Sequence, residues 1–339
     1  MSAVLAFAVA AVVTGVVAAS VRTLAGKAGL VDPPNPRVPR HTRPVATLGG
    51  VAVAAGCGAG LATGLDGSVE PWLGIGAGLV LAAGVSDDVH PLPIAAKLAL
   101  QTLAAGAAVA LGLELALTGN AFLDAVAAVG WILLVVNAVN LTDVCDGLVP
   151  GLAAIGFLAL AAIEPGSSGS AIVAAGACVG FLALNAPPAS IFLGDAGSHL
   201  VGFLLAALAL EAAGGGESAT NLVAPVLVLG VFLFELVFVV VERNRRDVPW
   251  WLGSDDHVAL RLQAAGLSSI RTDLLLWTCA AALGLGGLLA SRLESFTTLA
   301  PVLAAAVVAA RAWRMLRVLD RPAAAPFAVR TGASPPRRA

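Results

Sequence analysis

The segment NAVNLTDVCDGL, residues 137–148, ends a long apolar run and carries a polar side chain at every third position. An ionised side chain at bilayer depth costs roughly 2.5–3.5 kcal/mol on insertion scales, so acids at such a helix end need water, a metal ion or cationic partners. Positions three apart on a helix drift by about 60° per step, so all four side chains cannot face one point from a straight helix. We expect them to wrap around a pocket where the helix ends, near Gly147. The four are Asn137, Asn140, Asp143 and Asp146.

The composition is that of a membrane protein. Of the 339 residues, 59% are hydrophobic and 12% are charged, and the mean hydropathy is +0.93. A soluble domain carries about 25% charged residues. The net charge of −2 gives no indication of a nucleic acid partner. The four cysteines have no paired spacing, which is typical of small buried residues rather than of disulfides or a zinc site.

Eleven apolar segments have, or nearly have, the ~20 residues that cross a bilayer. We therefore expect an all-α, polytopic membrane bundle of ten or eleven helices in one domain, residues 1–320. A disordered cytoplasmic tail at 321–339 should follow. The first charge, Arg22, comes after the first apolar segment, which favours a membrane helix over a signal peptide. The segments are 3–20, 47–65, 71–86, 94–113, 121–139, 148–163, 169–185, 199–213, 221–241, 273–291 and 296–311.

The distribution of charge orients this bundle. With the N-terminus outside, all 19 Lys and Arg except Arg292 fall in the inside connections or the adjoining helix ends. The outside turns instead carry Asp66, Glu70, Glu114 and Glu164, among others. This positive-inside pattern predicts a cytoplasmic C-terminus. The inside connections are 21–46, 87–93, 140–147, 186–198, 242–272 and the tail.

The same orientation collects acids from three segments at the cytoplasmic face. Asp87 and Asp88 end the third span, and Asp195 follows the seventh in the turn GDAGS, residues 194–198. Together with residues 137–148 they predict a hydrated metal–phosphate site, and the alternative is a set of ordinary interfacial acids. Hard oxygen ligands favour Mg²⁺, with Mn²⁺ as the alternative. GDAGS also leads into a helix whose free N-terminal amides can meet a phosphate.

Four stretches, in order along the chain, resemble the motifs of the polyprenyl-phosphate N-acetylhexosamine-1-phosphate transferases. RPVATLGGVAVA resembles the family's Pro-x-x-Gly-Gly entry to the second helix, with one extra residue. SDDVHPLPIAAKLALQ resembles its Asp-Asp motif followed by Lys-x-x-x-Gln. NAVNLTDVCDGL and NAPPASIFLGDAGS resemble its two longest motifs. The stretches are residues 43–54, 86–101, 137–148 and 185–198.

The resemblance implies an enzyme that moves a sugar-1-phosphate from a UDP-sugar to a polyprenyl phosphate and releases UMP. It implies a multi-pass protein of the prokaryotic inner membrane whose active site faces the cytoplasm, and it leaves a homodimer open. Asp195 and Asp88 would hold Mg²⁺, and Asp87 and Asp88 would serve the lipid phosphate. Phe192 would lie near the uracil and Lys97 would help bind phosphate. The other residues expected to bind substrate are Asn137, Asn140, Asp143, Asp146, Asn185, His257 and Arg261.

The chain departs from the family pattern in two places. Val144 stands where the family has Gly, and it could narrow the pocket or replace a left-handed backbone conformation. In HVALRL, residues 257–262, one histidine remains and Leu260 stands where a second is common. We expect His257, in a water-facing loop, to donate to a diphosphate or sugar oxygen. The absence of a triple histidine favours the N-acetylglucosamine branch over the muramoyl-pentapeptide branch.

Three alternatives remain. One is a specialised or inactive member of the same family. Another is a secondary transporter, although transporter sites lie near the bilayer midplane in repeated halves, and no repeat is found in this sequence. The third is a CDP-alcohol phosphotransferase, whose Asp-Gly-x-x-Ala-Arg motif is missing from DGLVPGLAAIG.

The charge pattern yields a topology prediction. The loops that contain residues 37–43, Asp88 and residues 243–271 should lie in the cytoplasm, because Lys and Arg are retained on that side. Cysteines introduced there should resist a membrane-impermeant thiol reagent in intact cells and react after permeabilisation. Labelling in intact cells would contradict the orientation.

Overall fold

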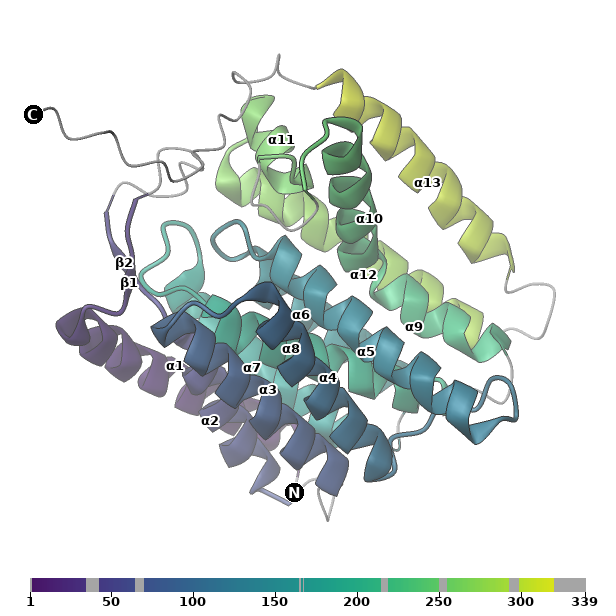
Figure 1. Ribbon diagram of the computed structural model, residues 1–339, viewed down its shortest axis with the longest axis horizontal. Coiled ribbons are helices and arrows are strands. Elements are labelled where there is room, and N and C mark those ends of the chain that lie inside the picture. Colours follow the sequence, from purple (N-terminus) through teal and green to yellow (C-terminus); the bar gives the residue numbers. More distant parts are fainter. Residues whose placement is uncertain are drawn as a thin grey trace, which may run out of the picture.

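The computed structural model is almost entirely helical (Figure 1), and it describes residues 2–34, 43–64, 70–164, 166, 168–214, 219–249, 255–292 and 299–319. The predicted tail at 321–339 lies outside the described residues. Two short strands, β1 (Val31–Asp32) and β2 (Val45–Ala46), pair in antiparallel register. The helices are α1 (Ala3–Ala28), α2 (Gly49–Leu61), α3 (Pro71–Val89), α4 (Ile94–Ala110), α5 (Ala121–Thr142), α6 (Leu148–Ile163), α7 (Ser168–Asn185), α8 (Gly194–Ala212), the 3₁₀ turn η3 (Ala219–Leu222), α9 (Val223–Val228), α10 (Gly230–Arg245), α11 (Val258–Ala264), α12 (Ser269–Arg292) and α13 (Leu299–Val318).

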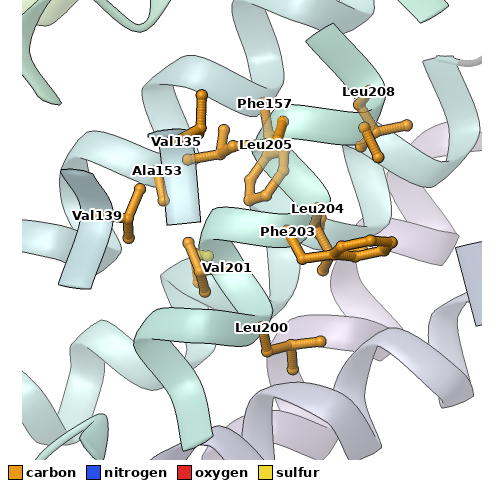
Figure 2. Close-up of a cluster of buried hydrophobic side chains, with 14 of the residues drawn as sticks. Val135, Val139, Ala153, Phe157, Leu200, Val201, Phe203, Leu204, Leu205 and Leu208 are labelled. Carbon is orange, nitrogen blue, oxygen red and sulfur yellow. The ribbon is translucent and has the colours of Figure 1, made fainter. Parts of the chain in front are cut away.

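Helix α8 lies at the centre of the bundle, in contact with α2, α3, α5 and α6 (Figure 1). It is buried without interruption from Ala196 to Leu210, because it is apolar on all sides and has helices around it. Figure 2 shows side chains of α8, including Phe203 and Leu205, in one cluster with Val135 of α5 and Phe157 of α6. Any group at the N-terminal end of α8 is therefore held by the most buried element of the fold.

The described helices support a multi-pass membrane protein. Six of them, α1, α3, α5, α7, α8 and α12, are long and apolar enough to cross a bilayer, and α2, α4 and α6 are shorter apolar helices. Large apolar side chains such as Val12, Phe122 and Leu285 are exposed on the outside of the bundle, as expected for a lipid-facing surface. The helical class is thus confirmed. The count of ten or eleven spans, the orientation of the termini and the single-domain boundary stay predictions.

Several expected segments differ from the structure. Helix α1 continues to Ala28, beyond the expected end at residue 20, and α13 ends at Val318 rather than at residue 311. Helix α8 begins at Gly194 rather than at residue 199, because the polar turn GDAGS is already helical. The segment 221–241 is divided into η3, α9 and α10. The short helix α11 was not predicted.

Glycines allow two helices to approach α8 closely. A Cβ on Gly84 of α3 would lie 2.5 Å from the Cα of Ala196, and a Cβ on Gly50 of α2 would collide with the backbone of Gly197. Small residues let membrane helices pack backbone to backbone. These contacts bring the ends of α2 and α3 against the first turn of α8.

We expect Gly84→Ala to destabilise the protein by about 1–3 kcal/mol, because the added methyl group would have to push α3 away from α8. Gly78→Ala, on the same helix, is the matched control, since its Cβ would meet no atom within 4 Å. Thermal unfolding midpoints in detergent should fall for the first variant and stay equal or rise for the second. An unfolding midpoint of Gly84→Ala equal to that of the wild type would contradict the close contact between α3 and α8.

Candidate functional site

A cavity of about 630 Å³ opens where the ends of α3, α5, α8 and α10 meet the β1–β2 hairpin. Six carboxylates line it, from Asp32, Asp87, Asp88, Asp143, Asp146 and Asp195. The structure thus brings together, in one wall, polar side chains from segments up to 225 residues apart (Asp32 to His257). The sequence-predicted residues in the lining are Asp87, Asp88, Asn140, Asp143, Asp146, Asn185, Phe192, Asp195 and His257.

Lys97 connects two of these carboxylates. Its Nζ lies 2.9 Å from Oδ2 of Asp195 and forms an ion pair with Oδ2 of Asp87. Asn140 donates from Nδ2 to the other oxygen of Asp195 at 2.8 Å and to the hydroxyl of Ser198 at 2.9 Å. One positive charge therefore lies between two negative ones, which reduces the cost of placing both acids at the edge of an apolar bundle.

Asp88 has a different role from its neighbour, as the angle of about 100° between adjacent helical residues predicts. Its two oxygens accept hydrogen bonds from the backbone amides of Asp195, at 2.8 Å, and Ala196, at 3.1 Å. Asp88 thus caps α8 from another helix. Gly194 has φ +71°, and a Cβ there would lie 2.5 Å from Oδ2 of Asp88, so the turn requires glycine. The expectation that these first amides are free for a phosphate is wrong, because Asp88 occupies them.

Asp146 and Asn185 connect the α5–α6 turn to the connection before α8. Asn185 accepts a hydrogen bond from the amide of Gly147 at 2.9 Å and donates one to the carbonyl of Ile191 at 2.8 Å. Oδ2 of Asp146 accepts from the amide of Ala189 at 2.9 Å. The pocket-facing turn is held by these bonds, with Gly147 in a left-handed conformation at φ +76°.

Asn137 does not reach the cavity. It lies about one turn deeper on α5 and donates to Oε1 of Gln101 and to the carbonyl of Leu133, both at 2.8 Å. The expectation that all four polar residues of the motif wrap around one pocket is therefore wrong for Asn137, because the helix continues to Thr142 and turns this side chain toward α4.

Val144 lies in the cavity wall and is 4% exposed. The non-glycine residues with a left-handed backbone in the described chain are Leu48 and Asp247. Val144 is not one of them, so its backbone is unstrained.

His257 lies at the cavity wall but is 3% exposed, so the expectation of a water-facing loop histidine is wrong. Its Nδ1 is 2.9 Å from Oε1 of Glu235, and its Nε2 is 3.3 Å from Nη2 of Arg243. A guanidinium can only donate hydrogen bonds, so Nε2 accepts and Nδ1 donates to the carboxylate. In this geometry His257 orients Arg243, which also lines the cavity, and has no N–H left to offer a ligand.

Arg261 lies outside the cavity lining. It donates to Oδ1 of Asp256 at 3.0 Å and to the carbonyl of Leu316 at 3.1 Å, and its guanidinium stacks over Phe238. It is 5% exposed. These contacts join α11 to α10 and α13, which lie beside each other in Figure 1. Arg261 thus stabilises the packing of these helices. Its role in substrate binding stays a prediction.

Residues 72–213, which run from α3 through α8, match the family described as glycosyl transferase family 4. A Bacillus subtilis (strain 168) protein named "Probable undecaprenyl-phosphate N-acetylglucosaminyl 1-phosphate transferase" is 30% identical over 290 residues. That match covers 81% of this chain and 81% of the relative. The chain belongs to glycosyl transferase family 4.

Other relatives fit the same family. A decaprenyl-phosphate N-acetylglucosaminephosphotransferase of Mycolicibacterium smegmatis is 30% identical, over 79% of this chain and 77% of the relative. A phospho-N-acetylmuramoyl-pentapeptide-transferase of Acaryochloris marina is 44% identical, but over 111 residues, 31% of this chain and 28% of the relative. The resemblance drawn from the four motifs is confirmed at the level of the family.

Sequence reasoning missed three residues of this family 4 protein. Asp32, in VDPPNPR, lines the cavity from the β1–β2 hairpin, and its position in an inside connection was the available signal. Arg243, in VERNRR, was counted only as an orienting charge. His199 lies one turn beyond Asp195 on α8 and is 3% exposed. A histidine in an otherwise apolar helix was the signal for it.

A magnesium ion at this site would have to take most of its ligands from bound phosphates and water. Among the described residues, no group of three or more His, Cys, Asp or Glu side chains is arranged to hold a metal. Mg²⁺ usually takes one or two carboxylates and completes its shell with water and phosphate oxygens. The side chain of Asp195 is 26% exposed, and its two oxygens accept hydrogen bonds from Lys97 and Asn140, which hold the carboxylate in place at the cavity.

The cap on α8 can be tested by stability. Asp88→Ala should cost about 0.5–2 kcal/mol, because it leaves the amides of Asp195 and Ala196 without an acceptor. Ser86→Ala is the control, since this exposed hydroxyl bonds only the carbonyl of Ala82 in its own helix in the described structure. The thermal unfolding midpoint should fall for Asp88→Ala and not for Ser86→Ala. A midpoint unchanged by Asp88→Ala would rule out the cap.

Proposed function

We propose that this family 4 protein transfers N-acetylglucosamine-1-phosphate, or a close HexNAc-1-phosphate, from a UDP-sugar to a polyprenyl phosphate, releases UMP and so initiates a cell-envelope glycan. The observation that carries the proposal is the cluster of Asp87, Lys97 and Asp195 at the ends of apolar helices, where a lipid phosphate and a water-soluble nucleotide can meet. The names of the B. subtilis and M. smegmatis relatives support the sugar and the lipid. The positive-inside pattern supports an inner-membrane protein whose site faces the cytoplasm.

The reaction exchanges one phosphate–oxygen bond for another. An oxygen of the lipid phosphate bonds to the sugar-bearing phosphorus, and the bond from this phosphorus to the bridging oxygen of the donor breaks, so that UMP leaves with that oxygen. Both reactants are anionic, so the protein must mainly position them and neutralise charge. Lys97 of α4 supplies positive charge through its ion pairs with Asp87 and Asp195, and Arg243 of α10 supplies it from the cavity lining.

Mg²⁺ fits this role, with Mn²⁺ as the alternative. When bound to a diphosphate it neutralises charge and polarises the phosphoryl oxygens. Asp195 would hold the ion, and its bonds to Lys97 and Asn140 would keep the carboxylate in place. Asp88 as a second ligand stays a prediction, since both of its oxygens already accept backbone hydrogen bonds.

The remaining cavity residues divide between the two substrates. Asp87 and Asp88, at the end of α3, would serve the lipid phosphate. Asp143, Asp146 and Phe192, which line the wall on the side of α5 and the α7–α8 connection, would serve the nucleotide sugar. His257 would act through Arg243, which it orients. Assembly as a homodimer stays a prediction.

The donor assignment can be tested with purified protein, Mg²⁺, undecaprenyl phosphate and a panel of radiolabelled UDP-sugars. We expect lipid-linked product and UMP from UDP-N-acetylglucosamine or a close UDP-HexNAc, because the loop around His257 lacks the triple histidine of the muramoyl-pentapeptide branch. Product from the muramoyl-pentapeptide nucleotide alone would refute the substrate. No UMP from any donor, together with transport of a solute, would favour the transporter alternative.

Asp195→Asn should lower the rate of transfer at least about 100-fold, while the protein still inserts into the membrane and elutes as a single species. The amide keeps the shape of the side chain but loses the charge that would pair with Lys97 and hold Mg²⁺. Initial rates across a Mg²⁺ titration provide the measurement. Asp247→Asn, at an exposed turn outside the cavity lining, is the matched control and should keep normal rates. Near-normal turnover by Asp195→Asn at all Mg²⁺ concentrations would refute the metal assignment.

A further inference from the structure

A layer of polar side chains lies inside the bundle, one helical turn below the cluster of Lys97, Asn140 and Asp195. Asn137 of α5 donates from Nδ2 to Oε1 of Gln101 on α4 at 2.8 Å. Nε2 of Gln101 lies 3.3 Å from Nε2 of His199 on α8. Gln101 is 2% exposed and His199 is 3% exposed. Three polar side chains from three helices thus form a hydrogen-bonded chain where an apolar core would be expected.

Each member of this deeper layer lies one turn from a member of the site. Gln101 follows Lys97 by four residues on α4, and His199 follows Asp195 by four residues on α8. Asn137 precedes Asn140 by three residues on α5. Residues three or four apart lie on the same helix face. The two layers, each of one residue from α4, α5 and α8, are therefore stacked.

The direction of the hydrogen bonds in the deeper layer is determined by chemistry. Oε1 of Gln101 accepts from Asn137, so its Nε2 is the amide nitrogen and can only donate. His199 must accept this bond at Nε2, which places its hydrogen on Nδ1. Nδ1 is buried and has no hydrogen-bond partner among the described residues. A buried polar atom without a partner is costly, so this histidine is an expensive choice for packing alone.

We propose that His199 is a positioning residue that, through Gln101 and Asn137, holds α4, α5 and α8 in the register that places Lys97 between Asp87 and Asp195. This proposal rests on the proposed transfer reaction, and it adds a layer of residues that position Lys97 for that reaction. A leucine of similar size at position 199 would fill the space but leave the Nε2–H of Gln101 without an acceptor. The rotation of α4 relative to α8 would then lose its polar constraint, and Lys97 would separate from Asp195.

The chemical reactivity of Lys97 measures this directly, without substrate. The chain contains two lysines, Lys97 and the exposed Lys27 at the end of α1, so Lys27 is an internal standard. An amine held by two carboxylates is protonated and reacts slowly with trace acetic anhydride. Peptide mass spectrometry gives the ratio of Lys97 to Lys27 acetylation. We expect this ratio to rise at least about fivefold in His199→Leu, because a loss of ~1 kcal/mol of ion pairing produces a change of that size. His199→Gln, whose amide oxygen can accept from Gln101, should stay near the wild-type ratio.

Two further variants separate positioning from general loss of packing. Phe203→Leu removes buried volume from the same helix outside the polar layer, and it should lower the thermal midpoint without changing the acetylation ratio. Gln101→Leu should raise the ratio as much as His199→Leu, and the double variant should raise it no further, because residues that act as a unit are not additive. An unchanged ratio in His199→Leu, a ratio in His199→Gln as high as in His199→Leu, or a rise in Phe203→Leu would each overturn the proposal.

Kinetics provide the functional readout. In His199→Leu we expect kcat to fall about tenfold and KM for the UDP-sugar to change less than about threefold, with recovery in His199→Gln. A fall in kcat without the change in Lys97 acetylation would overturn the mechanism. If wild-type protein transferred no sugar phosphate, the proposed function would fail, whereas the acetylation experiment would still decide whether His199 positions Lys97.

Discussion

The ion pairs of Lys97 with Asp87 and Asp195 are the interaction on which the rest of the site depends. They join α3, α4 and α8 at the point where carboxylates must leave an apolar bundle. Two unpaired carboxylates at this position would repel each other in a medium of low dielectric constant. With the lysine between them, both acids stay beside the cavity, and the side chain of Asp195 remains partly exposed there. The cluster therefore joins three helices of the fold and also forms the charged centre of the site.

The central helix α8 makes this arrangement rigid. Its first turn carries Asp195, and that turn is capped by Asp88 and approached at backbone distance by Gly84 and Gly50. The rest of the helix is buried on all sides, so its N-terminal end has little freedom to move. A phosphoryl transfer that relies on positioning more than on covalent chemistry benefits from such a support. The polar layer of Gln101, Asn137 and His199 adds a directional constraint, which apolar packing lacks.

A second network of buried charges holds the part of the cavity wall that Arg243 and His257 form. Arg261 pairs with Asp256 and Glu242, while His257 connects Glu235 to Arg243. Removing one partner from a buried network leaves an uncompensated charge, so these residues are interdependent. The network ties α13 to α10 and α11 through the carbonyl of Leu316. The position of Arg243 at the cavity thus depends on packing near the end of the described chain.

The sequence alone determined the helical membrane class, the family and most of the polar residues in the cavity wall. Long apolar segments and the motifs of residues 86–101, 137–148 and 185–198 carry that information, because hydropathy and motif spacing are local properties of the chain. Asp87, Asp88, Asn140 and Asp195 could all be named as site residues from their motifs. Only the tertiary structure decided what each of them touches. Asp88 is a cap because α3 crosses the start of α8. Asn137 turns toward Gln101 and away from the cavity because α5 runs to Thr142. His257 is buried because Glu235 and Arg243 enclose it. Those outcomes depend on where separate helices end relative to one another, which no single segment of the sequence specifies.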